Sequence, residues 1–198
     1  MTFSRLAAVA LVSLATAATA FSVEFVDVPG SRDTKYPSEV TGQLGSGTVT
    51  MKLTGTAMRT KYVLNVYAIA SYVQDSAKVS SAEAIAAVDC YKRLHLVMER
   101  NVEGKDMAEA FRAAIRANYP EGFDDEVNML VQLMRSNGAS KGDHIGLTHV
   151  PGVGLHVAMP GKVDFVIKNP KFSRAVWDIY LGKNNVGDNV KKGLTSRL

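Results

Sequence analysis

The most informative part of this chain is residues 55–73, GTAMRTKYVLNVYAIASYV, an apolar and aromatic run that contains two charges, Arg59 and Lys61. Alternation with a period of two predicts one long strand or a tightly bent pair of strands, with both faces covered. Asn65 and Tyr67 fall in register with Arg59 and Lys61 in this pattern. The opposite face holds Tyr62, Leu64, Val66, Ala68, Ala70 and Tyr72.

The two charges indicate the polar end of a pocket. A guanidinium beside an apolar wall can hold the carboxylate or enolate end of an apolar ligand, because its planar fork of donors matches an oxyanion and stays charged. Arg59 is therefore a candidate ligand-binding residue, with Lys61 beside it. The alternative is that both charges lie at an exposed strand end, where Lys and Arg are usually found.

The rest of the chain predicts blocks of strands and helices. Strand patterns occupy residues 23–28, 48–53, 91–99, 145–150, 154–158 and 163–167, and residues 31–38 read as a polar loop. Helix patterns occupy residues 81–88, 107–119, 123–134 and 173–181. Ser81 is suited to cap the first of these helices. Asn169-Pro170 is a start signal for the helix at residues 173–181, and Gly182 is its stop signal. Gly and Pro separate consecutive strands, as is typical of antiparallel pairs. This order predicts an α+β fold in which helices form a layer on one face of a mostly antiparallel sheet.

The first twenty residues have the pattern of a secretory signal peptide. Arg5 gives a positive start, residues 6–14 are apolar, and residues 18–20 form a small-residue cleavage site. The apolar run is too short to span a bilayer. We expect residues 1–20 to be removed and residues 21–198 to form one exported domain, located in the periplasm if the source is a bacterium.

Composition argues against several other classes of function. The formal net charge is +4, and the Lys and Arg residues are scattered, which argues against a nucleic-acid site. No segment after the signal peptide could cross a membrane as a helix. The single cysteine, Cys90, cannot form an internal disulfide, and we interpret it as an apolar filler between a helix and a strand.

Signals for a metal site or a nucleophile are weak. His149 and His156 flank a predicted turn that could bring them together, but Asp143 is the only carboxylate nearby and there is no cysteine. A nucleophile elbow around Ser46 would need glycines at the positions of Leu44 and Thr48. We therefore expect no metal, no cofactor and no nucleophilic serine.

Two motifs resemble those of chalcone isomerase-like proteins. The first is Gly55-x-x-x-Arg59-x-Lys61, followed by Val66-Tyr67-Ala68 and Tyr72. The second is FSRAVWDIYLG at residues 172–182, followed by Val186 and Leu194. The resemblance covers about residues 25–198. That family includes true chalcone isomerases, plant fatty-acid-binding relatives and a bacterial branch, so the resemblance implies the open-faced β-sandwich of the chalcone isomerase fold.

The resemblance also allows a check for chalcone isomerase activity, which needs a cationic oxyanion partner and a hydrogen-bonded tyrosine. The family's catalytic tyrosine, asparagine and terminal-helix hydroxyl fall at Met107, Ala114 and Ile179. The family's strand threonine falls at Tyr67. Of the positions compared, only Arg59 has the residue type of the family's catalytic site, so chalcone isomerase activity is not expected.

The fatty-acid-binding relatives fit better. In them an arginine and a tyrosine hold the ligand carboxylate, and the resemblance places these at Arg59 and Tyr72, with Tyr67 and Lys61 as further candidates. Residues thirteen apart on a straight strand face opposite sides, so convergence requires a bulge or bend, which we expect within residues 57–64. Apolar side chains that could line a tail pocket, or could simply be core, are Met98, Met107, Phe111, Ile115 and Trp177.

The leading hypothesis is an exported, non-catalytic protein that binds a small apolar carboxylate, such as a fatty acid, with Arg59 at the polar end of a cleft. A second hypothesis is an isomerase or lyase that uses Arg59 as electrophile and Tyr67 or Tyr72 as acid. A third is a partner-binding protein without a ligand. The sequence identifies neither a ligand nor a protein partner.

Overall fold

The computed structural model describes residues 23–44 and 47–198, so the expected signal peptide lies outside the described residues. The main feature of this part of the chain is a seven-stranded antiparallel sheet in which each strand pairs with the next along the chain. Its strands are β3 (Glu39–Leu44), β4 (Gly47–Lys61), β5 (Leu64–Gln74), β6 (Lys92–Met98), β7 (His144–Val150), β8 (Gly154–Met159) and β9 (Val163–Ile167). Two short strands, β1 (Phe25–Asp27) and β2 (Lys35–Pro37), form a separate pair.

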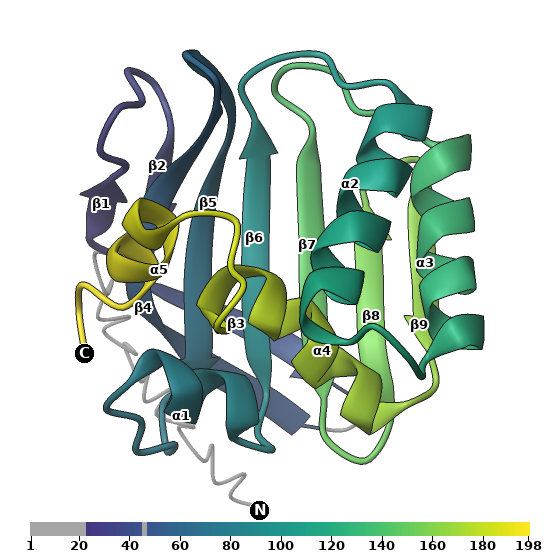
Figure 1. The fold of residues 1–198 in the computed structure, drawn as a ribbon. Coiled ribbons are helices and arrows are strands. Elements are labelled where there is room, and N and C mark those ends of the chain that lie inside the picture. Colours follow the sequence, from purple (N-terminus) through teal and green to yellow (C-terminus); the bar gives the residue numbers. More distant parts are fainter. Residues whose placement is uncertain (1–22, 45–46) are drawn as a thin grey trace, which may run out of the picture.

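Helices cover one face of this sheet. They are α1 (Ala82–Ala87), α2 (Gly104–Asn118), α3 (Asp124–Ser136), α4 (Pro170–Leu181) and α5 (Asp188–Leu194). Figure 1 shows α2, α3 and α4 in front of the sheet and α5 against β4 and β5. None of these helices is both long and apolar enough to cross a membrane. The predicted α+β class, an antiparallel sheet with a helix layer, is confirmed.

The sheet separates two hydrophobic cores, one on each face. The larger core lies between the sheet and the helices and includes Ile69, Leu94, Met98 and Trp177. The smaller core lies on the other face, where Tyr36 of β2 packs against residues of β4 and β5 such as Tyr72. The Tyr36 hydroxyl donates hydrogen bonds to the carbonyl oxygens of Ala68 and His95, both at 3.0 Å. The β1–β2 pair therefore covers part of the face that the helices leave open.

Residues 55–73 form a bent pair of strands rather than one long strand. β4 ends at Lys61, a two-residue turn follows, and β5 begins at Leu64. The pairing register shifts between Leu53 and Gly55 and again between Arg59 and Thr60. The second shift lies within residues 57–64, where the sequence predicted an irregularity, and it bends the strand beside Arg59.

Two strands were not predicted. Residues 31–38 were expected to form a polar loop, but they include β2, and β3 follows at once. Polar residues and Gly42 interrupt the apolar alternation of β3, so its pattern is weak. The strand forms because β4 is long enough to pair with it, as in the register Val40–Met51.

α5 lies unusually close to β4. A Cβ atom on Gly55 would lie 2.1 Å from the carbonyl oxygen of Gly193, so only glycine fits there. At the adjacent register shift the Thr54 hydroxyl donates to the Leu194 carbonyl oxygen at 2.8 Å and lies 2.9 Å from the Ser71 hydroxyl oxygen. These contacts fix the last helix of the chain across the hairpin that carries Arg59.

The helix boundaries follow local signals in the sequence. The Ser81 side chain accepts a hydrogen bond from the Ala84 amide and caps α1, as predicted. Asn169 caps α4 in the same way through the Lys171 amide, and Pro170 occupies the first turn. α4 ends at Gly182, also as predicted.

Candidate functional site

Arg59 and Tyr67 are cross-strand partners in the β4–β5 hairpin. Both side chains lie on the helix-covered face, because Tyr67 packs against the larger core and Arg59 reaches its hydroxyl group. Met98 of β6 is the register neighbour of Tyr67 on the other side. The alternation in the sequence placed Arg59 and Tyr67 in register, and the structure confirms this.

The third member of the site, Tyr180, comes from α4. It is 1% exposed, and its hydroxyl is hydrogen-bonded to that of Tyr67. Burial raises the pKa of Tyr67, while the hydrogen bond from Tyr180 and the charge and hydrogen bond of Arg59 partly oppose that rise. Burial also raises the pKa of Tyr180, and its bond to Tyr67 adds to the effect.

Tyr67 therefore has two polar neighbours on this face, the Arg59 guanidinium and the Tyr180 hydroxyl. Arg59 also donates from Nη1 to the Thr60 carbonyl oxygen at 2.5 Å. Among the described residues no carboxylate forms a salt bridge with Arg59. A half-buried guanidinium without an acidic partner, next to tyrosine hydroxyl groups, is an arrangement suited to an anion.

Tyr72 does not join this group, which corrects the expected convergence of Arg59 and Tyr72. Tyr67 and Tyr72 are five residues apart on β5, and an odd separation places side chains on opposite faces of a strand. Tyr72 is fully buried in the smaller core, and its hydroxyl donates to the Pro37 carbonyl oxygen at 3.0 Å. Its contacts are those of a core residue on the far face of the sheet.

Lys61 also lies apart from the buried hydroxyl groups. It is exposed at the end of β4, and its Nζ is 6.0 Å from the centre of the Tyr62 ring.

The expected pocket-lining residues share one core, but they are spread through it. All of them are buried: Met98, Met107, Phe111, Ile115 and Trp177. Met98 is the strand neighbour of Tyr67, whereas the Trp177 ring lies 5.1 Å from Nζ of Lys92 at the opposite end of β6. Contact with a ligand tail stays a prediction for each of them.

The residue that sequence reasoning missed is Tyr180. The terminal-helix hydroxyl of the family was expected at Ile179, which is buried and carries no hydroxyl. The next residue along α4 provides the hydroxyl that reaches Tyr67. A shift of one position in the comparison of the last helix would have identified it. At the other two positions, Met107 is buried and Ala114 partly buried, both in the larger core.

His149 and His156 do not come together at one site. His149 pairs with Leu155, and His156 pairs with Thr148, so the two histidines face opposite sides of the sheet. His149 Nε2 lies 2.7 Å from Asp89 Oδ1, and His156 Nε2 lies 2.6 Å from Asp164 Oδ1. Within the described ranges, no three potential metal ligands of the His, Cys, Asp and Glu types come together.

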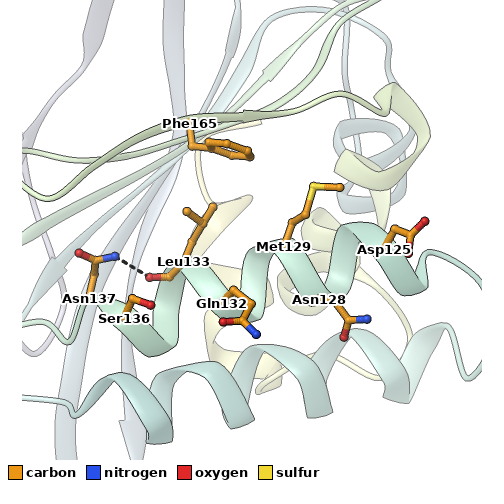
Figure 2. Close-up of a pocket in the computed structure, with 8 residues that line it drawn as sticks. All are labelled: Asp125, Asn128, Met129, Gln132, Leu133, Ser136, Asn137 and Phe165. Atoms are coloured by element: carbon orange, nitrogen blue, oxygen red, sulfur yellow. Dashed lines mark hydrogen bonds between the residues drawn. The ribbon is translucent and has the colours of Figure 1, made fainter.

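A separate groove lies between α3 and the edge strand β9. Figure 2 shows Phe165 facing the Leu133 and Met129 side chains across this groove, which has a volume of about 520 Å³. Polar side chains, such as Gln132 and Asn128, line its remaining wall. The groove contains neither a charged donor such as Arg59 nor a buried hydroxyl pair, so its character is that of a surface depression.

Comparison with known proteins agrees with the fold and the hairpin motif. The model of the family described as chalcone isomerase-like matches residues 36–195. A search of curated proteins found no significant match. Among solved structures, a fatty-acid binding protein from Arabidopsis thaliana superimposes with a TM-score of 0.63 at 18% sequence identity. The alignment covers 87% of this chain and 96% of that one. At this identity the similarity establishes the shared fold.

Proposed function

This chain belongs to the chalcone isomerase-like family, and we propose that it is an exported binding protein for a small apolar carboxylate, such as a fatty acid. The observation that carries the proposal is the grouping of Arg59, its cross-strand partner Tyr67 and Tyr180 of α4 on the helix-covered face of the hairpin. Export rests on the signal-peptide pattern of residues 1–20.

The ligand carboxylate would bind where the Arg59 guanidinium and the Tyr67 hydroxyl both offer protons. The Tyr67 hydroxyl carries one proton, which it can donate to a ligand oxygen. One carboxylate oxygen would take this proton, and the guanidinium would supply a charge-assisted bond to the other oxygen. The raised pKa of Tyr67 keeps this donor protonated at neutral pH.

The apolar tail would extend into the larger core, beside Met98. Met98 and Met107 are unbranched and adaptable, so they can change rotamer and open a path without disturbing the sheet. Phe111 and Met107 keep small exposed fractions, 8% and 5%, on the same core. The tail path therefore runs from the Arg59–Tyr67 pair along the inner side of α2.

The similarity to the plant protein supports this reading at the level of fold. That protein is a fatty-acid binding protein, and 96% of its chain aligns with this one. The assignment of the same class of ligand to this chain belongs to the proposal and depends on the experiment that follows.

Two measurements test the proposal. An organic extract of the purified protein, examined by mass spectrometry, should contain a co-purified fatty acid. Titration of delipidated protein with laurate should then show binding that Arg59→Ala weakens by about 2–5 kcal/mol, because the carboxylate loses its charged partner in a partly dry site. Arg59→Lys should restore only part of the affinity, since a point charge cannot reproduce the fork.

Arg112→Ala is the matched control, because Arg112 is an exposed arginine of α2 that contacts Asn128. It should bind laurate as the wild type does. An unchanged laurate affinity in Arg59→Ala, together with a lower melting temperature, would make Arg59 a scaffold residue and end the carboxylate proposal.

The same geometry favours one second function, an isomerase or lyase. Arg59 would hold the oxygen of an enolate, and Tyr67 would deliver its proton to the substrate and recover it in the return step. Turnover of an enone or a β-hydroxy carbonyl compound, abolished by Tyr67→Phe and by Arg59→Ala, would favour this function over simple binding.

A further inference from the structure

The tip of the β4–β5 hairpin, residues 61–64, exposes three consecutive apolar or aromatic side chains. Tyr62 is 91% exposed, Val63 is 92% exposed and Leu64 is 53% exposed. Single exposed apolar residues are common on protein surfaces, but three in succession at the end of a projecting hairpin form a cluster that water solvates poorly. The tip therefore has the character of a contact surface.

The backbone of the tip points to the same conclusion. Tyr62 has a φ of 59°, in the left-handed region that favours glycine or asparagine, while Val63 does not. Gly-Asn would form a two-residue hairpin turn of this kind with less strain and better solubility. The Tyr62-Val63 pair costs conformational energy in this turn. The exposed side chains, and not the backbone conformation, therefore account for these two residues.

The chemistry of the tip suits a lipid surface. A tyrosine next to aliphatic residues and a lysine is the combination found where proteins enter the interfacial region of a bilayer. Lys61 is exposed and forms no salt bridge with any described residue, so its charge is available to anionic headgroups. Contact between two such tips would bring two Lys61 side chains together, which disfavours a second copy of the chain as the occupant.

The position of the tip links it to the ligand site. Arg59 lies two residues before Lys61 on β4, and its cross-strand partner Tyr67 lies three residues after Leu64. We propose that residues 61–64 insert into an anionic lipid surface and hold the Arg59–Tyr67 site at the level where a fatty-acid carboxylate leaves or enters the bilayer. This inference rests on the proposed function and adds to it the source of the ligand.

Vesicle binding tests the inference directly. Wild-type protein should sediment with vesicles of phosphatidylglycerol and phosphatidylethanolamine, and less well with pure phosphatidylcholine vesicles. The double variant Tyr62→Gly, Val63→Asn should lower the partition coefficient about tenfold or more, because it removes two apolar side chains from the contact. Its turn is more favourable, so it should melt at the same temperature or higher.

The matched control is Val153→Asn. Val153 is 44% exposed in the turn between β7 and β8, which the strand pairing places at the opposite end of the sheet. This variant should bind vesicles as the wild type does. Tyr62→Trp gives an independent readout, since brominated lipids should quench the new fluorophore but leave the fully buried Trp177 unaffected.

The outcomes separate the docking inference from the proposed function. If the tip variant binds laurate normally in solution but takes it up more slowly from vesicles, docking is supported. If the variant and the wild type sediment equally with anionic vesicles, docking is wrong even where laurate binding is intact. If the wild type does not sediment with vesicles but self-associates through the tip, docking is wrong and the tip is a protein interface. Absence of laurate binding in every protein would instead end the proposed function.

Discussion

Nζ of Lys92 lies 5.1 Å from the centre of the Trp177 ring, and both side chains are buried between the sheet and the helices. The same ammonium group donates hydrogen bonds to the carbonyl oxygens of Ile85, Ala86 and Val88, where α1 ends. One ammonium group thus satisfies the carbonyl groups at the C-terminus of α1 and packs against the face of an aromatic ring. Burial lowers the pKa of Lys92 to about 8.

Lys92→Met should destabilise the fold by about 3 kcal/mol. The substitution keeps most of the apolar volume but leaves three buried carbonyl groups without their donor. Urea unfolding measures the change, and Lys105→Met, at an exposed position of α2, is the control. Equal stabilities of the two variants would show that the α1 terminus does not depend on Lys92.

Gly55→Ala should cost about 3 kcal/mol of stability, because the added Cβ collides with the backbone of Gly193 and forces α5 away from β4. Gly47→Ala is the control on the same strand, since no atom lies within 4 Å of the position of its Cβ. Thermal unfolding followed by circular dichroism distinguishes them. A melting temperature of Gly55→Ala near that of wild type would mean that α5 can shift freely.

Tyr180→Phe should weaken laurate binding about fivefold, since the site loses the hydroxyl group beside Tyr67. Tyr72→Phe should leave laurate affinity unchanged and lower stability instead, because only the bond to the Pro37 carbonyl is lost. Titration calorimetry on both variants measures the affinities. The reverse pattern would place the ligand on the other face of the sheet.

Stability should fall between pH 6.5 and pH 3 partly through His95. Burial, then the charge of Arg93 and then His144, lower the pKa of His95 to about 3. The unfolded chain binds a proton below about pH 6.5, whereas the folded chain does not until about pH 3, so acid favours unfolding over this interval. His95→Phe should remove about 3 kcal/mol of this acid sensitivity, whereas His156→Phe should not. Urea unfolding at pH 7 and pH 4 tests both.

Most of the fold could be predicted because its signals are local. The cap at Ser81, the start at Asn169 and the stop at Gly182 depend on neighbouring residues, and each bounds a helix as expected. Alternation within residues 55–73 also predicted that Tyr67 would face the same way as Arg59. Each of these features is decided within a few residues of the chain.

The rest of the candidate site depends on whether two residues of an element are an odd or an even number of positions apart, and on contacts between segments far apart in the sequence. One residue of offset in α4 exchanges Ile179 for Tyr180, and only the placement of α4 over the sheet shows which one reaches Tyr67. Tyr72 faces the smaller core because it lies an odd number of residues from Tyr67, and the β1–β2 pair covers it there. β3 forms because it pairs with β4, and the composition of β3 alone does not predict this pairing.

The contact between α5 and β4 also sets the order in which the molecule can be completed. Thr54 and Leu194 are 140 residues apart in sequence, yet their hydrogen bond closes the hairpin side of the core. The hairpin is therefore synthesised long before α5, and the hairpin side of the core stays uncovered until α5 has been made and has packed against β4.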